Sequence, residues 1–179
     1  GGCQYQMAPL DLQRKWKRNQ VKDVFTKIGK LDFNSSGSGT SAWSTLPNIE
    51  VDECIGTSHE YEYRTKLTPH YDSPKAIEDL KIGFQRRGTK SMIDIEQCII
   101  ASKPITRKYI TMRKQIKTDM IENGIPKKGS TLLFREGTHE YVEMDHNKFI
   151  KQQVKDTLFS FKAGEFFQNN AYVLPLMVD

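Results

Sequence analysis

The sequence predicts an α+β fold in which a mostly antiparallel sheet is flanked by helices. Two segments, 11–31 and 104–123, have apolar residues at the spacing of amphipathic helices. Between and after them lie short runs of alternating residues, separated by turn residues such as Gly137-Thr138. Because strands joined by short turns pair antiparallel, the expected sheet is mainly antiparallel.

The first predicted helix begins near Asp11 and ends near Gly29, and it carries a basic face. Its apolar positions are Leu12, Trp16, Val21, Val24, Phe25 and Ile28. We interpret residues 1–31 as an N-terminal segment built on this helix. Residues 32–59 contain the polar run NSSGSGTS and little periodicity, so they are expected to be a flexible insertion.

Residues 60–160 have the pattern of a central α+β domain. Strands are predicted at 60–68, 82–85, 91–95, 130–135, 140–144 and 156–162. The second and third of these flank Arg86-Arg87-Gly88-Thr89, which predicts a hairpin with a basic tip. The helix predicted at 104–123 should stop at Asn123-Gly124.

The last segment, 161–179, contains two asparagines that can cap a following helix. The residues of that helix are mostly apolar and need a partner surface. We therefore interpret 161–179 as the beginning of a further domain. An ordinary C-terminal helix packed on its own core is the alternative, and composition favours it about as strongly.

The length and composition of the chain bound its class. At 179 residues it can bury a core and hold one sizeable domain, or one and a half smaller ones. Its apolar stretches are shorter than the roughly 18 residues that a membrane span needs, and no signal-peptide pattern is present. The three cysteines are odd in number and widely spaced, unlike a secreted disulfide scaffold. We expect a soluble, intracellular and monomeric protein that does not bind membranes.

Positive charge is concentrated in two short segments of the chain. Residues 11–30 carry seven Lys or Arg against two acids, and residues 103–128 carry eight against two. The remainder holds more acids than bases. Clustered positive charge on an otherwise acidic chain indicates a polyanionic partner, and solvated helix faces are the equally common alternative.

Two short motifs have residue types that suit RNA. Arg64 and Lys66 are two apart on a predicted strand, so they share a face from which they could bind successive phosphates. In GFQRRGTK, Phe84 could stack on an unpaired base while Arg86 or Arg87 neutralises phosphate. The alternatives are an exposed charged strand face and a Phe that belongs to the core. The four histidines lack metal-ligand spacing, and no glycine-rich nucleotide-binding motif is present.

Four segments taken together resemble the RNA uracil-5-methyltransferase family. They are GGCQYQ at 1–6, YRTKLTPHYD at 63–72, IGFQRRGTKSMIDIEQC at 82–98 and FSFKAGEFFQNNAYVLPLMV at 159–178. This family uses S-adenosyl-L-methionine to make 5-methyluridine in tRNA and in ribosomal RNA. The YRTKLTPH form and the Ser/Gly-rich insertion are most similar to eukaryotic tRNA enzymes that act on the T-loop uridine, uracil-54.

The resemblance implies roles for the central domain and for the C-terminal segment. The central domain would bind RNA, here the T-arm of tRNA, and residues 161–179 would open a Rossmann-like methyltransferase domain. Phe166 and Gln168 match the family's F-x-Q-x-N motif, whose glutamine contacts S-adenosyl-L-methionine. Phe84 and Arg64 match family positions that lie near the RNA.

Some family members hold a [4Fe–4S] cluster, and Cys3 and Cys98 match the last two of its four cysteine ligands. The first two ligands are absent from this chain, and two thiolates cannot hold a cubane alone. The family's glycine-rich cofactor loop, nucleophilic cysteine and general base would all lie beyond Asp179. We therefore assign no catalytic residue and expect this part of a tRNA uracil-5-methyltransferase to be inactive alone. Ribosomal RNA methylation and a non-catalytic RNA-binding module are the alternatives.

Overall fold

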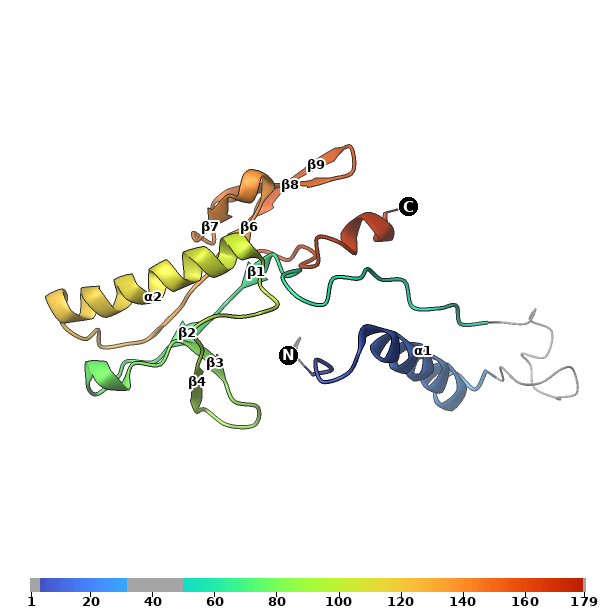
Figure 1. The fold of residues 1–179 in the computed structure, drawn as a ribbon, viewed down its shortest axis with the longest axis horizontal. Coiled ribbons are helices and arrows are strands. Elements are labelled where there is room, and N and C mark those ends of the chain that lie inside the picture. The colour runs from blue at the N-terminus through green and yellow to red at the C-terminus, as the bar shows by residue number, and fades with distance from the viewer. Residues whose placement is uncertain (1–3, 32–49, 179) are drawn as a thin grey trace, which may run out of the picture. The chain divides into compact units, whose positions relative to one another are not determined.

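The computed structural model describes residues 4–31 and 50–178. They belong to two units, Gly1–Ser58 and His59–Asp179, and Figure 1 shows the elements of each. Cys3 and most of the predicted insertion at 32–59 lie outside the described residues. Within the described ranges, no helix combines the length and the apolar character that crossing a membrane requires.

The first unit is built on α1 (Leu10–Lys27), which confirms the predicted N-terminal helix. No residue of α1 is fully buried. Residues 50–58 contain neither helix nor strand, and two arginines of α1 bind their backbone. Arg18 Nε donates to the Val51 carbonyl at 2.8 Å, and Arg14 donates to another carbonyl of the same segment. Part of the predicted basic face therefore binds this chain and not a partner.

The second unit is organised around α2 (Lys103–Asn123), which confirms the helix predicted at 104–123. Pro104 lies in its first turn, where a missing N–H costs no hydrogen bond, and Gly124, with a φ of 87°, follows its last residue. One face of α2 is buried in the main core. That core consists of Leu67, Ile82, Ala101, Ile105, Tyr109, Ile116, Met120 and Phe134.

Two small sheets and a hairpin complete the second unit, and every ladder between described strands is antiparallel, as predicted. The first sheet has the order β1 (Lys66–Leu67), β6 (Phe134–Glu136), β7 (Val142–Glu143). The second has the order β4 (Met92–Asp94), β3 (Gly83–Gln85), β2 (His70–Tyr71), β5 (Ser130–Thr131). The hairpin pairs β8 (Phe149–Val154) with β9 (Thr157–Lys162). Short 3-10 turns lie at η1 (Ile77–Asp79), η2 (Thr138–Glu140) and η3 (Leu174–Met177).

Three strands differ from the sequence prediction. The strand predicted at 130–135 is divided into β5 and β6, which belong to different sheets. The strand predicted at 60–68 is limited to β1, and the fully buried Pro69 separates it from β2, which belongs to the other sheet. The prediction omitted β8. Burial alternates along that strand, but the middle inward position is Gln152 and the apolar Phe149 is exposed, so the residue types do not show the alternation by which strands are recognised.

The helix predicted at the C-terminus is wrong in type, because residues 174–177 form the 3-10 turn η3. Pro175 has no N–H with which to continue an α-helix. Asn170 Oδ1 accepts hydrogen bonds from the Tyr172 and Val173 amides, both at 3.1 Å, and so caps the turn before η3, whereas η3 itself has no side-chain cap. The C-terminal segment is thus a capped turn.

Candidate functional site

The segment after β9, residues 163–170, exposes Phe166 and Gln168 and partly encloses Phe167 and Asn169. Phe166 is 81% exposed, and Gln168 is also exposed. Between them, Phe167 stacks on Phe161 of β9 with the ring centroids 4.2 Å apart. The two residues predicted to contact the cofactor are therefore both accessible to a ligand.

Arg135 of β6 anchors this segment. Its side chain is fully buried, and each of its three nitrogens donates a hydrogen bond. Nη1 donates to Asn169 Oδ1 at 2.9 Å, Nη2 to the Glu165 carbonyl at 3.0 Å and Nε to the Ala163 carbonyl at 3.4 Å. The guanidinium also lies over the Phe161 ring, 5.5 Å from its centroid.

The sequence analysis did not single out Arg135, although a signal for it exists. Leu133, two residues earlier, is fully buried. Because alternate residues of an extended chain point to the same side, this apolar position places the arginine side chain on the interior side too. The intervening Phe134 is fully buried as well, so both faces of this stretch are interior, and the signal is that Arg135 directly follows this apolar run.

Residues 65 and 66 reach the same C-terminal segment. Lys66 Nζ donates to the carbonyls of Gly164 at 2.9 Å and Glu165 at 3.3 Å. The Asn169 carbonyl accepts the Thr65 amide at 2.8 Å and the Thr65 hydroxyl at 3.1 Å. Two of the three ammonium donors of Lys66 are thus used within the chain, and one remains for a ligand.

Arg64, Lys66 and Arg135 form a cationic cluster, and none of the three has an ion-pair partner among the described residues. Burial lowers the pKa of Arg135 to about 10, and the charge of Arg64 adds to this effect. Burial likewise lowers the pKa of Lys66, helped by the charges of Arg135 and Arg64. Because carbonyl oxygens and not carboxylates surround these cations, the cluster keeps a positive potential that favours an anionic ligand.

Arg64 is a half-buried member of this cluster with donors left over for a ligand. Its backbone forms bridges with Ala101 and Asn170, and its Nε donates to the Lys66 carbonyl at 2.8 Å. Within the described part of the chain, its two terminal nitrogens have no hydrogen-bond acceptor. They are available to an oxyanion such as a phosphate.

The other predicted RNA contacts lie on the β3–β4 hairpin, which confirms the hairpin expected there. Arg86 and Arg87 are exposed at its tip. Phe84, paired with Ile93, is half-buried and packs against the main core, so only part of its ring can meet a base. The five residues predicted from the motifs therefore fall in two places: Arg64 and Lys66 beside the C-terminal segment, and the other three on the hairpin.

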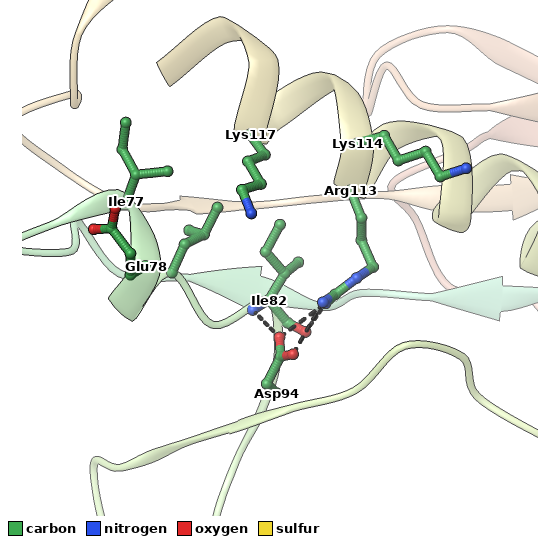
Figure 2. Close-up of a pocket in the computed structure, with 8 residues that line it drawn as sticks. Ile77, Glu78, Ile82, Asp94, Arg113, Lys114 and Lys117 are labelled. Carbon is green, nitrogen blue, oxygen red and sulfur yellow. Dashed lines mark hydrogen bonds and ion pairs between the residues drawn. The ribbon is translucent and has the colours of Figure 1, made fainter. Parts of the chain in front are cut away.

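A pocket of about 300 Å³ lies between α2, η1 and this hairpin, and Figure 2 shows residues that line it. Arg113 extends from α2 to Asp94 of β4, with Nη1–Oδ1 and Nη2–Oδ2 distances of 2.9 and 3.0 Å (Figure 2). Arg113 Nη1 also donates to the Ile82 carbonyl at 2.7 Å. Burial alone would raise the pKa of Asp94, but hydrogen bonds from Arg113 and the Ile82 amide hold it below its usual value. Lys117 extends from α2 into the pocket and forms no ion pair with a described residue.

Of the two predicted cluster ligands, the structure describes Cys98. It is half-buried and packs against the main core, which is the ordinary position of a structural cysteine. No three His, Cys, Asp or Glu side chains in the described ranges are grouped so that they could hold a metal ion. The described residues therefore do not form a metal site.

Comparison with known proteins finds RNA methyltransferases similar to this chain. It is 37% identical, over 97% of its length, to the tRNA (uracil(54)-C(5))-methyltransferase of Schizosaccharomyces pombe, of which it spans 31%. It is 25% identical, over 98% of its length, to the enzyme of the same name from Saccharomyces cerevisiae, of which it spans 34%. The chain is therefore related to the RNA uracil-5-methyltransferase family, as its motifs predicted, and corresponds to about a third of these relatives' length.

The chain was also compared with protein-family profiles and with solved structures. No protein-family profile matches the chain. Among solved structures, a Pyrococcus abyssi tRNA (uracil-54, C5)-methyltransferase in complex with S-adenosyl-L-homocysteine superposes with a TM-score of 0.47 and 15% identity. That superposition covers 66% of this chain and 40% of the archaeal chain.

Proposed function

We propose that this chain is the part of an S-adenosyl-L-methionine-dependent tRNA methyltransferase that binds the RNA and contributes one edge of the cofactor site. The complete enzyme would methylate carbon 5 of the T-loop uridine, uracil-54, to give ribothymidine. The observation that carries the proposal is the similarity, over 97% of the chain, to a tRNA (uracil(54)-C(5))-methyltransferase. Because the chain spans only 31% of that relative, the activity is proposed for the complete protein.

The proposal assigns a role to each region of the chain. Residues 60–160 would form the RNA-binding domain, and 161–179 would begin a Rossmann-like methyltransferase domain. Phe166 and Gln168 would contact S-adenosyl-L-methionine, which supplies the methyl group when bound. Both side chains are exposed, they are two positions apart, and they match the F-x-Q-x-N motif, which supports this assignment.

The tRNA T-arm would meet the chain at the two places described above. The terminal nitrogens of Arg64, the remaining donor of Lys66, and Arg86 and Arg87 at the hairpin tip would bind phosphates. The exposed part of Phe84 would stack on a base. A uridine must leave its stack before carbon 5 can be reached, and such contacts would hold the surrounding RNA while it does so.

The residues that the structure describes do not by themselves fit a [4Fe–4S] cluster. Such a cluster needs four thiolates, whereas the described residues supply one of the matching cysteines, Cys98, packed against the core. We derive no step through it.

The test of this function uses the full-length protein with methyl-labelled S-adenosyl-L-methionine and nucleoside analysis of the RNA product. We expect label in 5-methyluridine from unmodified tRNA, and none from a tRNA in which uridine 54 is replaced by cytidine. Label in ribosomal RNA and not in tRNA would transfer the proposal to ribosomal RNA methylation. Tight RNA binding with no label in either RNA would refute the enzyme and leave a non-catalytic RNA-binding module.

Gln168→Ala separates an enzyme from a pure RNA binder, because a pure binder has no need of this glutamine. In the full-length protein we expect the substitution to weaken binding of S-adenosyl-L-methionine and to leave RNA affinity unchanged, as measured by titration calorimetry. Gln153→Ala removes an exposed glutamine of β8 and serves as the control. Equal loss of cofactor and RNA affinity in Gln168→Ala would contradict the assignment.

A further inference from the structure

We propose that Arg135 is a positioning residue that holds Phe166 and Gln168 in the orientation in which they meet their ligand. This inference rests on the proposed function, because it takes these two residues as contacts of S-adenosyl-L-methionine. It adds a residue that matches none of the motifs quoted for the family and that touches the ligand only through others.

The hydrogen bonds of Arg135 fix some residues of the 163–170 segment and leave others accessible to a ligand. One guanidinium binds the Ala163 carbonyl, the Glu165 carbonyl and the Asn169 side chain. The residues between the second and third of these anchors are 166–168. Because both ends of this short stretch are bound to one rigid planar group, the backbone between them is constrained, and with it the directions in which the Phe166 and Gln168 side chains leave the chain.

The opposite side of the segment is equally constrained. The Gly164 amide donates to the His146 carbonyl at 3.0 Å, and the Ala163 amide donates to the Lys148 carbonyl at 2.9 Å. A Cβ atom at Gly164 would lie 2.9 Å from the same His146 carbonyl oxygen, so the approach requires glycine. Backbone bonds to the turn before β8 therefore hold one part of the segment, and side-chain donors of Arg135, Lys66 and Thr65 hold the rest; Arg135 alone binds at three separate points.

Stability alone does not explain an arginine at this position. Burying a guanidinium carries a large desolvation penalty, and replacement of buried charges by apolar residues of similar volume is often neutral or stabilising. The neighbours of Arg135 would suit an apolar side chain: Leu133, Ala163, Ile150 and Phe161 form a small second core. What an apolar residue cannot supply is three donors aimed at three acceptors of the ligand-binding segment.

The test uses the full-length protein and two pairs of substitutions. Asn169→Ala removes one acceptor of Arg135, whereas Asn169→Asp keeps an acceptor there. Arg135→Met removes all donors at similar side-chain length, and Arg135→Lys keeps the charge. Asn147→Ala, which truncates an exposed asparagine in the turn before β8, is the matched control.

Two measurements are made on each variant, beside its melting temperature. Chymotrypsin cleavage at Phe166 and Phe167 in the ligand-free protein reports how firmly the segment is held, and calorimetry gives the Kd for S-adenosyl-L-methionine. We expect Asn169→Ala to raise both the cleavage rate and the Kd by about threefold to tenfold, as loss of one hydrogen bond implies. Arg135→Met should raise both by more than about tenfold. Asn169→Asp and Arg135→Lys should recover part of each loss, and Asn147→Ala should match the wild type.

The outcomes separate this inference from the proposed function. Wild-type cleavage rates in Asn169→Ala would overturn it, and so would a wild-type Kd in variants whose melting temperature has fallen, since that combination marks a purely structural role. If the wild-type protein binds no S-adenosyl-L-methionine, the proposed function fails and this inference fails with it. If the wild type binds and all variants bind equally well, only this inference is refuted. Should Arg135→Met not fold, the Asn169 pair decides.

Discussion

The ion pair between Arg113 and Asp94 is the main polar link between α2 and the β3–β4 hairpin, and Arg113→Met tests it. The substitution removes both bonds to the carboxylate and the bond to the Ile82 carbonyl. A hydrogen bond to a charged group contributes about 1.5–3 kcal/mol when buried, but surface ion pairs contribute about 0–1 kcal/mol. The Arg113 and Asp94 side chains are 20% and 38% exposed, so solvent screens the pair in part. We expect a loss of about 1–2 kcal/mol in the free energy of unfolding of the second unit.

The effect should depend on pH in a defined direction. The pKa of Asp94 is held below its usual value of 3.8 in the folded chain. Its pair with Arg113 therefore contributes stability above that value, and the contribution is lost as the pH falls through the lower, folded pKa. The difference between the wild type and Arg113→Met should be full at neutral pH and should shrink in strong acid.

The assay is urea unfolding followed by far-ultraviolet circular dichroism, to which α2 contributes strongly. A double-mutant cycle with Asp94→Asn isolates the coupling between the two side chains. Lys114→Met, on the same helix and without an ion pair to any described residue, is the control. A coupling energy of zero, or a loss of stability as large in strong acid as at neutral pH, would refute the reasoning.

Three further predictions follow from the same unit. Phe84→Ala should lower the free energy of unfolding by about 1–3 kcal/mol, because its ring is half-buried, and should also lower the RNA affinity of the folded full-length protein. Melting curves measure the first loss and RNA titrations the second. An unchanged melting curve would exclude the core contact. Arg86→Ala and Arg87→Ala should each remove about one phosphate contact, which lowers the slope of log affinity against log salt concentration by about one. Slopes equal to that of the wild type would show that the hairpin tip does not touch RNA. Burial raises the pKa of Glu136, and the neighbouring Ser102 hydroxyl and Arg107 charge oppose this effect only in part. Stability should therefore fall as the pH rises from 4.5 through the raised, folded pKa. Glu136→Gln should stabilise the chain at pH 7 and have little effect below pH 4.5 in urea unfolding; destabilisation at pH 7 would contradict this account.

Local signals in the sequence were sufficient for α2 and for the β3–β4 hairpin. The helix has a regular apolar face with a proline at one end and a glycine at the other, and the hairpin has turn residues at its tip. Neither depends on a distant part of the chain for its recognition. The exposure of Arg86 and Arg87 follows from the same local pattern.

Features that depend on distant residues could not be predicted in this way. The strand predicted at 60–68 ends just before Pro69, but only the structure shows that the residues before and after this proline enter different sheets. Whether the Lys66 ammonium faces solvent or the carbonyls of 164 and 165 is decided by a segment almost one hundred positions later. The role of Phe166 and Gln168 was predicted from the resemblance to a family, and the structure adds only that both side chains are exposed.

The long sequence separation between Arg135 and its acceptors bears on how the chain is made. The hydrogen-bond partners of this arginine follow it by 28 to 34 residues. During synthesis the guanidinium must stay in water until they emerge from the ribosome, and the small core beside it must stay open for the same time. The helix α2, whose contacts within itself are local, can form well before then. A nascent chain stalled before residue 163 would thus carry a formed helix beside an unfinished core, which is the kind of intermediate that chaperones bind.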